Sequence, residues 1–248
     1  MFDPFKDLAQ AGYLRNRYGE KDLQIVQELE HQLFRAGLDD AIAYLAGRQS
    51  LGYGDFLAVH RILFASFYPW AGQDRASTAP DIAVSKAGTW FSHPLDAQRA
   101  VEQGLQIARD KQQLRQRPGE VMGLFAYGHP FLDGNGRTML VVHSELCHRA
   151  GFCVEWRRTR KADYLATLSE EIASPGRGIL DAYLLPLIGD IQDRQRWGGM
   201  IGMLPGLDGQ GAEDKVEGDY RDDEVSQKYR EFEQRRSYRT DAPPDKRE

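Results

Sequence analysis

Cysteine is scarce in this sequence: Cys147 and Cys153 are the two thiols among 248 residues. Two thiols cannot build the disulfide framework of a small secreted domain, and this usage fits a reducing compartment. No run approaches the roughly 18 apolar residues of a membrane span, and the N-terminus lacks an apolar stretch long enough for a signal peptide. We therefore expect a cytoplasmic protein without a membrane segment, and export by a route that reads no such signal stays open.

An excess of basic charge is also missing. Lys and Arg total 32 against 37 Asp and Glu, which gives a net charge of -5 and a pI near 5.7. This balance lacks the basic footprint of a nucleic-acid-binding protein, so we expect no nucleic-acid partner. The 41% of hydrophobic residues is enough for one substantial core.

Apolar residues recur at helical spacing along most of the chain. The expected helices cover residues 21–36, 56–67, 95–117, 120–128, 138–150, 161–173 and 178–196. Gly37 is expected to end the first helix and Pro186 to kink or break the last. Between the second and third helices, alternation around Ile82 and Val84 with Gly88 at a turn predicts a short hairpin.

The composition changes after Pro205, where residues 206–248 contain 22 charged side chains among 43. Such a segment buries too little apolar surface to offset its ordering entropy. The sequence therefore predicts one domain over residues 1–205, including an N-terminal helical part. A charged, disordered tail is expected over 206–248, in which a helix over 225–238 could order on a partner.

The stretch HPFLDGNGRTML, residues 129–140, places several kinds of chemistry side by side. Its glycines let the backbone turn N–H groups toward one point, and a helix beginning near Arg137 adds its positive dipole end, which suits a phosphate. Arg137 can add a charge-assisted contact. Asp133 is the hard oxygen ligand that magnesium prefers beside phosphates. His129 can accept a proton near neutral pH, as an attacking hydroxyl requires.

Seven specified positions in one register set this stretch apart from an ordinary turn between helices, for which Asp-Gly and Asn-Gly pairs would suffice. HPFLDGNGR resembles the signature of the Fic family, His-x-Phe-x-Asp/Glu-Gly-Asn-Gly-Arg. HRILFASFYPWAGQDR (60–75) looks like the upstream segment of that family, and GYLRNRYGEKDLQIVQELE (12–30) looks like the start of its domain. GFCVEW (151–156) fits the turn after the motif, so the resemblance covers about residues 5–190.

The resemblance implies an all-α fold, namely a Fic-type helical domain with a short β-hairpin flap over the active site at about residues 82–91. It makes His129 the catalytic general base, Asp133 the magnesium ligand and Phe131 the buried structural anchor of the motif. The nucleotide-binding residues that it implies are Gly134, Asn135, Gly136 and Arg137, together with Lys86, Ala87, Gly88 and Thr89 on the flap. A target protein would dock on the flap by main-chain pairing.

By the same resemblance, we expect AMP transfer from ATP, with Mg²⁺, to a Ser, Thr or Tyr hydroxyl of a target protein. Leu140 departs from the full signature, in which a second arginine usually faces the terminal phosphate. The donor therefore stays open among ATP, UTP, GTP and a phosphocholine carrier, as does ATP in the orientation of a Doc-like kinase. A catalytically inactive binding domain is the other alternative, against which the intact His129 and Asp133 argue.

Many relatives carry an inhibitory helix with Ser/Thr-x-x-x-Glu-Gly/Asn, whose glutamate pairs with the second arginine. No Ser or Thr precedes Ser50, and the C-terminal region offers only EDKVEG (213–218), with Glu213 in the Ser/Thr place. We therefore expect no inhibitory helix of this kind in the chain. If the protein is a toxin of this family, its inhibitor would be a small separate antitoxin-like protein, or it would have none.

Overall fold

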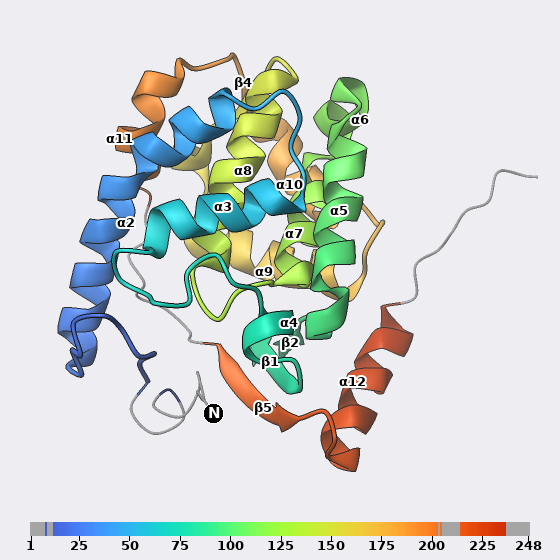
Figure 1. The fold of residues 1–248 in the computed structure, drawn as a ribbon. Coiled ribbons are helices and arrows are strands. Elements are labelled where there is room, and N and C mark those ends of the chain that lie inside the picture. The colour runs from blue at the N-terminus through green and yellow to red at the C-terminus, as the bar shows by residue number, and fades with distance from the viewer. Residues whose placement is uncertain (1–7, 9–11, 203, 205–213, 237–248) are drawn as a thin grey trace, which may run out of the picture.

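The computed structural model describes residues 8, 12–202, 204 and 214–236, which form a helical bundle with a small sheet at one end (Figure 1). The longer helices are α2 (Leu23–Ala46), α3 (Tyr53–Phe64), α5 (Ala97–Ala108), α7 (Pro118–Gly128), α8 (Asn135–Arg149), α9 (Lys161–Ala173) and α12 (Asp223–Arg235). The shorter ones are α4 (Arg75–Thr78), α6 (Lys111–Gln116), α10 (Ile179–Leu184) and α11 (Trp197–Ile201). The expected helical fold with a hairpin is confirmed.

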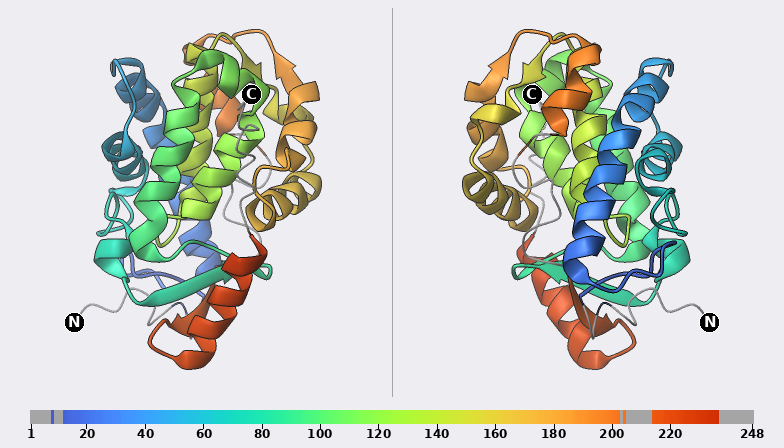
Figure 2. Two further views of the ribbon diagram at one scale, coloured as in Figure 1. Left: turned by 90° about the vertical axis from the view of Figure 1, so that its right-hand side faces the viewer. Right: turned by 90° about the vertical axis from the view of Figure 1, so that its left-hand side faces the viewer.

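Helix α7 forms the centre of the bundle, and every one of its residues is buried. Its sequence is apolar on all sides, as expected for a helix with neighbours all round. Helix α8 packs beside it, with α2 and α3 on one side and α9 and α10 on the other (Figure 2). The segment that joins α7 to α8 is the 129–134 motif, so it lies at the ends of the two central helices.

Helix α2 does not end at Gly37, as the sequence predicted, but continues to Ala46. A Cβ at Gly37 would lie 3.0 Å from the carbonyl oxygen of Ile62 in α3. The glycine therefore allows two helices to approach closely, and the signal for a helix end was wrong here. The helix expected over 95–117 is broken before Asp110, which caps α6. The helix expected over 178–196 is broken near Pro186, where a kink or break was predicted, since α10 ends at Leu184.

A three-stranded antiparallel sheet carries the flap. It consists of β2 (Thr89–Trp90), β1 (Ile82–Lys86) and β5 (Lys215–Asp219), in that spatial order. Strands β1 and β2 form the expected hairpin, whose turn holds Ala87 and Gly88 at φ 49° and 83°. Strand β5 comes from the C-terminal segment and was not predicted. A second sheet of two residues per strand joins β3 (Cys153–Val154) to β4 (Ile188–Gly189).

The expectation of a tail without a fold is corrected for residues 214–236, which form β5 and α12. Helix α12 buries Val225 and Phe232, so its few apolar residues gather on one face. Arg236 donates from Nε to the carbonyl oxygen of Ile172 in α9 at 2.7 Å. The charged composition of this segment predicted that it would be solvated. In the structure, the short apolar face of α12 and the long side chain of Arg236 dock the segment on the helical domain. Residues 206–213 and 237–248 lie outside the described residues.

Within the described ranges, none of the helices combines the length and the apolar character needed to cross a lipid bilayer.

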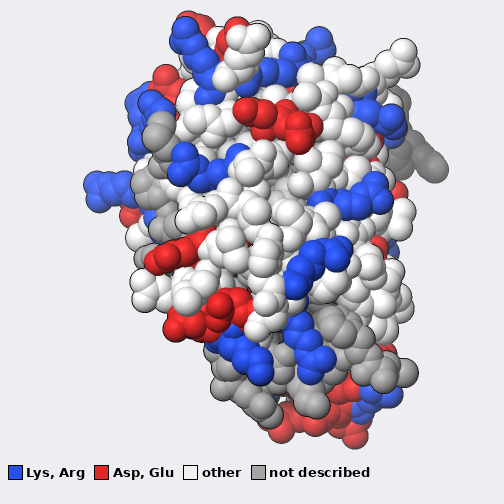
Figure 3. Space-filling model, turned by 60° about the vertical axis from the view of Figure 1, so that its left-hand side comes forward, with Lys and Arg blue, Asp and Glu red and all other residues white. Residues whose placement is uncertain are grey.

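On the face shown in Figure 3, Lys and Arg side chains are interspersed with Asp and Glu.

Candidate active site

The motif loop begins at His129, which ends α7 in the left-handed region with φ 41° and ψ 56°. Few non-glycine residues adopt this conformation, and histidine adopts it more readily than most. Arg75 fixes the backbone here, since its Nε donates to the carbonyl oxygen of His129 at 2.8 Å and its amide donates to that of Pro130 at 2.6 Å. The imidazole of His129 stacks on Phe91 with ring centroids 3.6 Å apart. The surrounding fold thus determines both the position of His129 and the plane of its imidazole ring.

Phe131 and Asn135 hold the loop together. Phe131, the expected anchor, is fully buried and stacks on His60 with centroids 3.7 Å apart. The Asn135 amide closes a ring with the main chain of Phe131, accepting from its N–H and donating to its C=O at 2.8 Å each. The Asn135 side chain therefore shapes the loop, and its backbone N–H lies in the first turn of α8.

The start of α8 is the candidate anion site. The first intrahelical bond runs from the N–H of Thr138 to the carbonyl of Gly134, so the preceding N–H groups have no acceptor within the helix. Gly134 has φ 76°, and a Cβ there would lie 2.5 Å from the ring of Phe64. Gly136 differs, because a Cβ there would meet no atom within 4 Å. Its missing side chain leaves open space above the N–H groups, which is where a phosphate would approach.

The carboxylate of Asp133 lies beside this helix end, with 45% of its side chain exposed. It accepts from the hydroxyl of Tyr68 at 3.3 Å and lies 3.4 Å from Arg137. No cluster of three or more metal-ligating side chains occurs in the described part of the chain. A magnesium ion would therefore be held by this one carboxylate together with substrate phosphates and water, the arrangement common for Mg²⁺. The exposed, hard oxygen donors of Asp133 fit that role.

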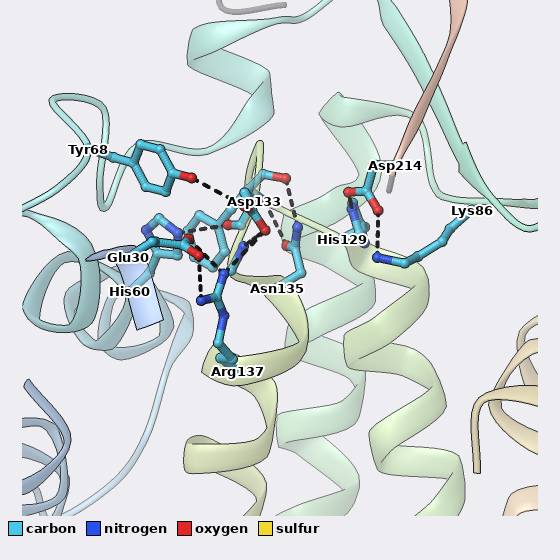
Figure 4. A network of polar contacts seen from close by, with 11 residues as sticks. Glu30, His60, Tyr68, Lys86, His129, Asp133, Asn135, Arg137 and Asp214 are labelled. Atoms are coloured by element: carbon cyan, nitrogen blue, oxygen red, sulfur yellow. Dashed lines mark hydrogen bonds and ion pairs between the residues drawn. The ribbon is translucent and has the colours of Figure 1, made fainter. Parts of the chain in front are cut away.

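Arg137 was expected to hold phosphates through its side chain, but its guanidinium is bound by Glu30 of α2. The two form a bidentate pair with distances of 2.8 and 2.7 Å, shown in Figure 4. Burial acts to lower the pKa of Arg137, but the carboxylates of Glu30 and Asp133 outweigh it and raise the pKa above its ordinary value. Arg137 is thus a buried cation that draws Asp133 into place and can offer its backbone N–H to an anion.

Asp214, just before β5, reaches the imidazole of His129. Its Oδ2 lies 2.6 Å from His129 Nε2, and its Oδ1 accepts from Lys86 Nζ at 3.2 Å (Figure 4). Burial lowers the pKa of His129 below its ordinary 6.5, although Asp214 acts in the opposite direction. Burial acts to raise the pKa of Asp214, but His129 and Lys86 outweigh it and the pKa falls below its ordinary 3.8. Asp214 is thus an ionised carboxylate, and Nε2 must donate to it.

These groups line one cavity of about 370 Å³ between the motif and the flap. Its walls include His129 and Asp133, all four residues from Gly134 to Arg137, and Glu30, Leu140 and Asp214. Lys86, Ala87 and Thr89 line it from the flap side, whereas Gly88 lies in the flap turn. The volume lies within the range of small-molecule sites. The structure therefore brings the imidazole, the carboxylate, the helix N-terminus and the flap to one place.

Sequence reasoning missed four residues of this site. Glu30 and Asp214 are far along the chain from their partners, and an acidic residue on a helix or in a charged segment carries no local signal. Arg75 and His60 appeared in the sequence analysis only as the two ends of the segment 60–75. His60 accepts from the N–H of Gly72 and donates to the carbonyl of Asp133 at 3.0 Å. His60 thus holds the backbone of the motif loop at Asp133.

The helical fold places the hairpin flap and the N-terminus of α8 on one cavity. Residues 50–147 match the family model described as Fic/DOC family, so the chain carries a Fic/DOC domain over these residues. The motif and the fold that it predicted are therefore confirmed together.

Two curated relatives are 29% identical to the chain. One is the protein adenylyltransferase VbhT of Bartonella schoenbuchensis, matched over 178 residues that cover 65% of this chain and 34% of the relative. The other is the probable protein adenylyltransferase y4lH of Sinorhizobium fredii, matched over 148 residues that cover 56% of this chain and 72% of the relative. The chain thus spans about a third of the length of VbhT.

Solved structures confirm the fold. The BepC protein of Bartonella tribocorum with bound AMPPNP superposes with a TM-score of 0.62 at 18% identity, covering 74% of this chain and 95% of that one. The N-terminal Fic domain of a Bartonella quintana effector with bound ADP gives a TM-score of 0.62 at 17% identity, covering 75% and 95%. At these identities the likeness concerns the arrangement of the helices.

Proposed function

We propose that the chain is a Fic-type protein adenylyltransferase, which transfers AMP from ATP to a Ser, Thr or Tyr hydroxyl of another protein. The observation that carries this proposal is the placement of His129 and the N-terminus of α8 on one cavity under the flap. The names of the two curated relatives support the same activity. The AMPPNP and ADP in the two similar structures support an adenine nucleotide as the donor.

In the proposed reaction, the phosphates lie on the N–H groups at the start of α8, where Gly136 leaves room for them. His129 Nε2 accepts the proton of the target hydroxyl, whose oxygen forms a bond to the α-phosphorus while the bond to pyrophosphate breaks. Magnesium, when bound, would neutralise charge on the phosphates beside Asp133. The lowered pKa of His129 keeps the imidazole unprotonated at neutral pH, as a base requires once Nε2 is free.

Labelled ATP tests the proposal directly. Wild-type protein should transfer label to a protein from α-labelled ATP in the presence of Mg²⁺, and none from γ-labelled ATP. Transfer of the γ-label alone would indicate a kinase and would reject nucleotide transfer. The same assay with UTP, GTP and a phosphocholine carrier would identify a different donor.

The role of Asp133 has its own test. Asp133→Asn keeps the size of the side chain and removes the charge that a hard cation needs. We expect it to weaken ATP binding measured with Mg²⁺ more than binding measured with the metal chelated. Equal losses under both conditions would show that Asp133 serves only the structure of the loop.

A further inference from the structure

The C-terminal strand β5 fills the free edge of the flap. It runs antiparallel to β1 in a register that places Ile82 opposite Asp219 and Ser85 opposite Lys215, with a bulge between Ala83 and Val84. Strand β2 occupies the other edge of β1. A strand can pair with only two neighbours, so no segment of another protein can pair with β1 while β5 is in place.

The strand is followed by an anchor, which is α12 with Arg236; we call residues 214–236 the C-terminal strap. The hydroxyl of Tyr229 accepts from the N–H of His93 at 2.9 Å, close to the end of the flap. The hydroxyl of Tyr127, at the centre of the bundle, donates to Glu233 at 2.9 Å. Arg236 lies over the ring of Tyr127. These contacts hold α12 on the domain, and Figures 1 and 2 show the helix following β5 at the end of the molecule that carries the flap.

At its other end the strap covers the reactive nitrogen of the site. Asp214 follows the register of β5 to the position opposite Lys86 and places its carboxylate 2.6 Å from His129 Nε2. A hydroxyl that is to lose its proton to Nε2 needs this same position. Because the ionised carboxylate only accepts, it also keeps the proton of the neutral imidazole on Nε2. His129 Nε2 is thus blocked both by its contact with Asp214 and by the proton that it carries.

The strap is joined to the flap by side chains as well as by its backbone. Ser85 Oγ donates to Glu217 Oε1 at 2.5 Å, and Lys86 Nζ binds Asp214. Glu217 holds the glutamate position of the EDKVEG segment that was compared with the inhibitory motif. In the structure this glutamate contacts the flap, and the contact with the motif loop comes from Asp214 instead.

We propose that residues 214–219 occupy the docking place of the acceptor segment and that Asp214 masks His129, so the strap must leave β1 before another protein is modified. This inference rests on the proposed function. It specifies the acceptor as an extended segment that pairs antiparallel with β1 and carries its hydroxyl at the position of Asp214. The chain therefore holds an internal competitor for its own target.

Asp214→Ala removes the contact with His129 and Lys86, and Asp223→Ala is a matched control because that carboxylate is exposed on α12 of the same strap. Amide hydrogen exchange of the full chain is the first measurement. Exchange should become about tenfold to a hundredfold faster in 82–86 and 215–219 of Asp214→Ala, the range expected for one charge-assisted hydrogen bond. Helices α7 and α8 should keep their protection, and Asp223→Ala should resemble the wild type.

The second measurement is AMP transfer from α-labelled ATP to proteins of a cell extract. We expect a gain of about tenfold or more for Asp214→Ala, by the same hydrogen-bond range, and no transfer by the His129→Ala/Asp214→Ala double variant. A loss of transfer in Asp214→Ala would overturn the inference and make Asp214 a positioning residue for the imidazole. Unchanged transfer and unchanged exchange would overturn it as well. Faster exchange without transfer by any variant would support masking by the strap and reject the proposed function.

Discussion

The Nε atom of Arg75 donates to the carbonyl oxygen of His129 at 2.8 Å, although the two residues are 54 positions apart. The Nη2 atom of the same guanidinium donates to the carbonyl of Ser92 at 2.9 Å, and Nη1 lies 3.4 Å from that of Ile82. Arg75 is fully buried. One side chain therefore joins the motif loop to both ends of the flap, and it fixes the distance between them.

Arg75→Lys should destabilise the domain. A single ammonium cannot reach three carbonyls, so at least one buried acceptor loses its partner. The loss of one charge-assisted bond predicts a decrease of about 1.5–3 kcal/mol in the free energy of unfolding. Urea unfolding would measure it, with Arg99→Lys on the exposed face of α5 as the control. Equal stability of the two variants would contradict the role given to Arg75.

Alanine substitutions at the two glycines of the motif should have different effects on stability and on nucleotide binding. Gly134→Ala should lower the melting temperature, because of its positive φ and the clash with Phe64. Gly136→Ala should fold with native stability, since its Cβ meets open space. It should nevertheless weaken nucleotide binding by about tenfold or more, the value of one charge-assisted hydrogen bond. Calorimetric titration of the stable variant measures this, and unchanged affinity would place the phosphates elsewhere.

Leu140 tests the position of the terminal phosphate. It lies one helical turn beyond Arg137, is 5% exposed, and lines the cavity. An arginine there could extend into the cavity, so Leu140→Arg should tighten ATP binding by about tenfold or more while changing ADP binding much less. The variant must first show native melting, because the side chain also packs against the core. Equal changes for ATP and ADP would show that this position does not face the γ-phosphate.

Acid should destabilise the protein through its buried histidines. Burial lowers the pKa of His60 from 6.5 to about 3 and that of His143 to about 4. Between these values and 6.5 the unfolded state binds more protons, so the free energy of unfolding falls as the pH falls from 6.5. From pH 6.5 to 4.5, His60→Gln should reduce this fall by about 2 kcal/mol. Urea unfolding at both pH values would show it, and an unchanged pH dependence would mean that His60 is protonated in the fold.

The sequence predicted those parts of the site that are local in the chain. His129, Asp133 and the glycines lie within nine consecutive residues, so their spacing alone defines a loop and a helix start. The Glu30–Arg137 and Asp214–His129 pairs join residues 107 and 85 positions apart, and no periodicity reports such a pairing. The predictions of a helix end at Gly37 and of an unfolded C-terminal segment were wrong for a related reason. Close helix packing and docking on the flap depend on neighbours that a local pattern does not contain.

The base at His129 is the centre of the proposed function, and His129→Ala tests it most directly. The alanine removes the proton acceptor and leaves the N–H groups at the start of α8 in place, so nucleotide binding should persist. Wild-type protein and variant would each be incubated with ATP, Mg²⁺ and a cell extract, and modified peptides would be identified by mass spectrometry. We predict AMP on Ser, Thr or Tyr side chains with the wild type, and a decrease of about a hundredfold to ten-thousandfold with the variant. Equal AMP modification by a folded His129→Ala variant, or phosphate alone on the targets, would contradict it.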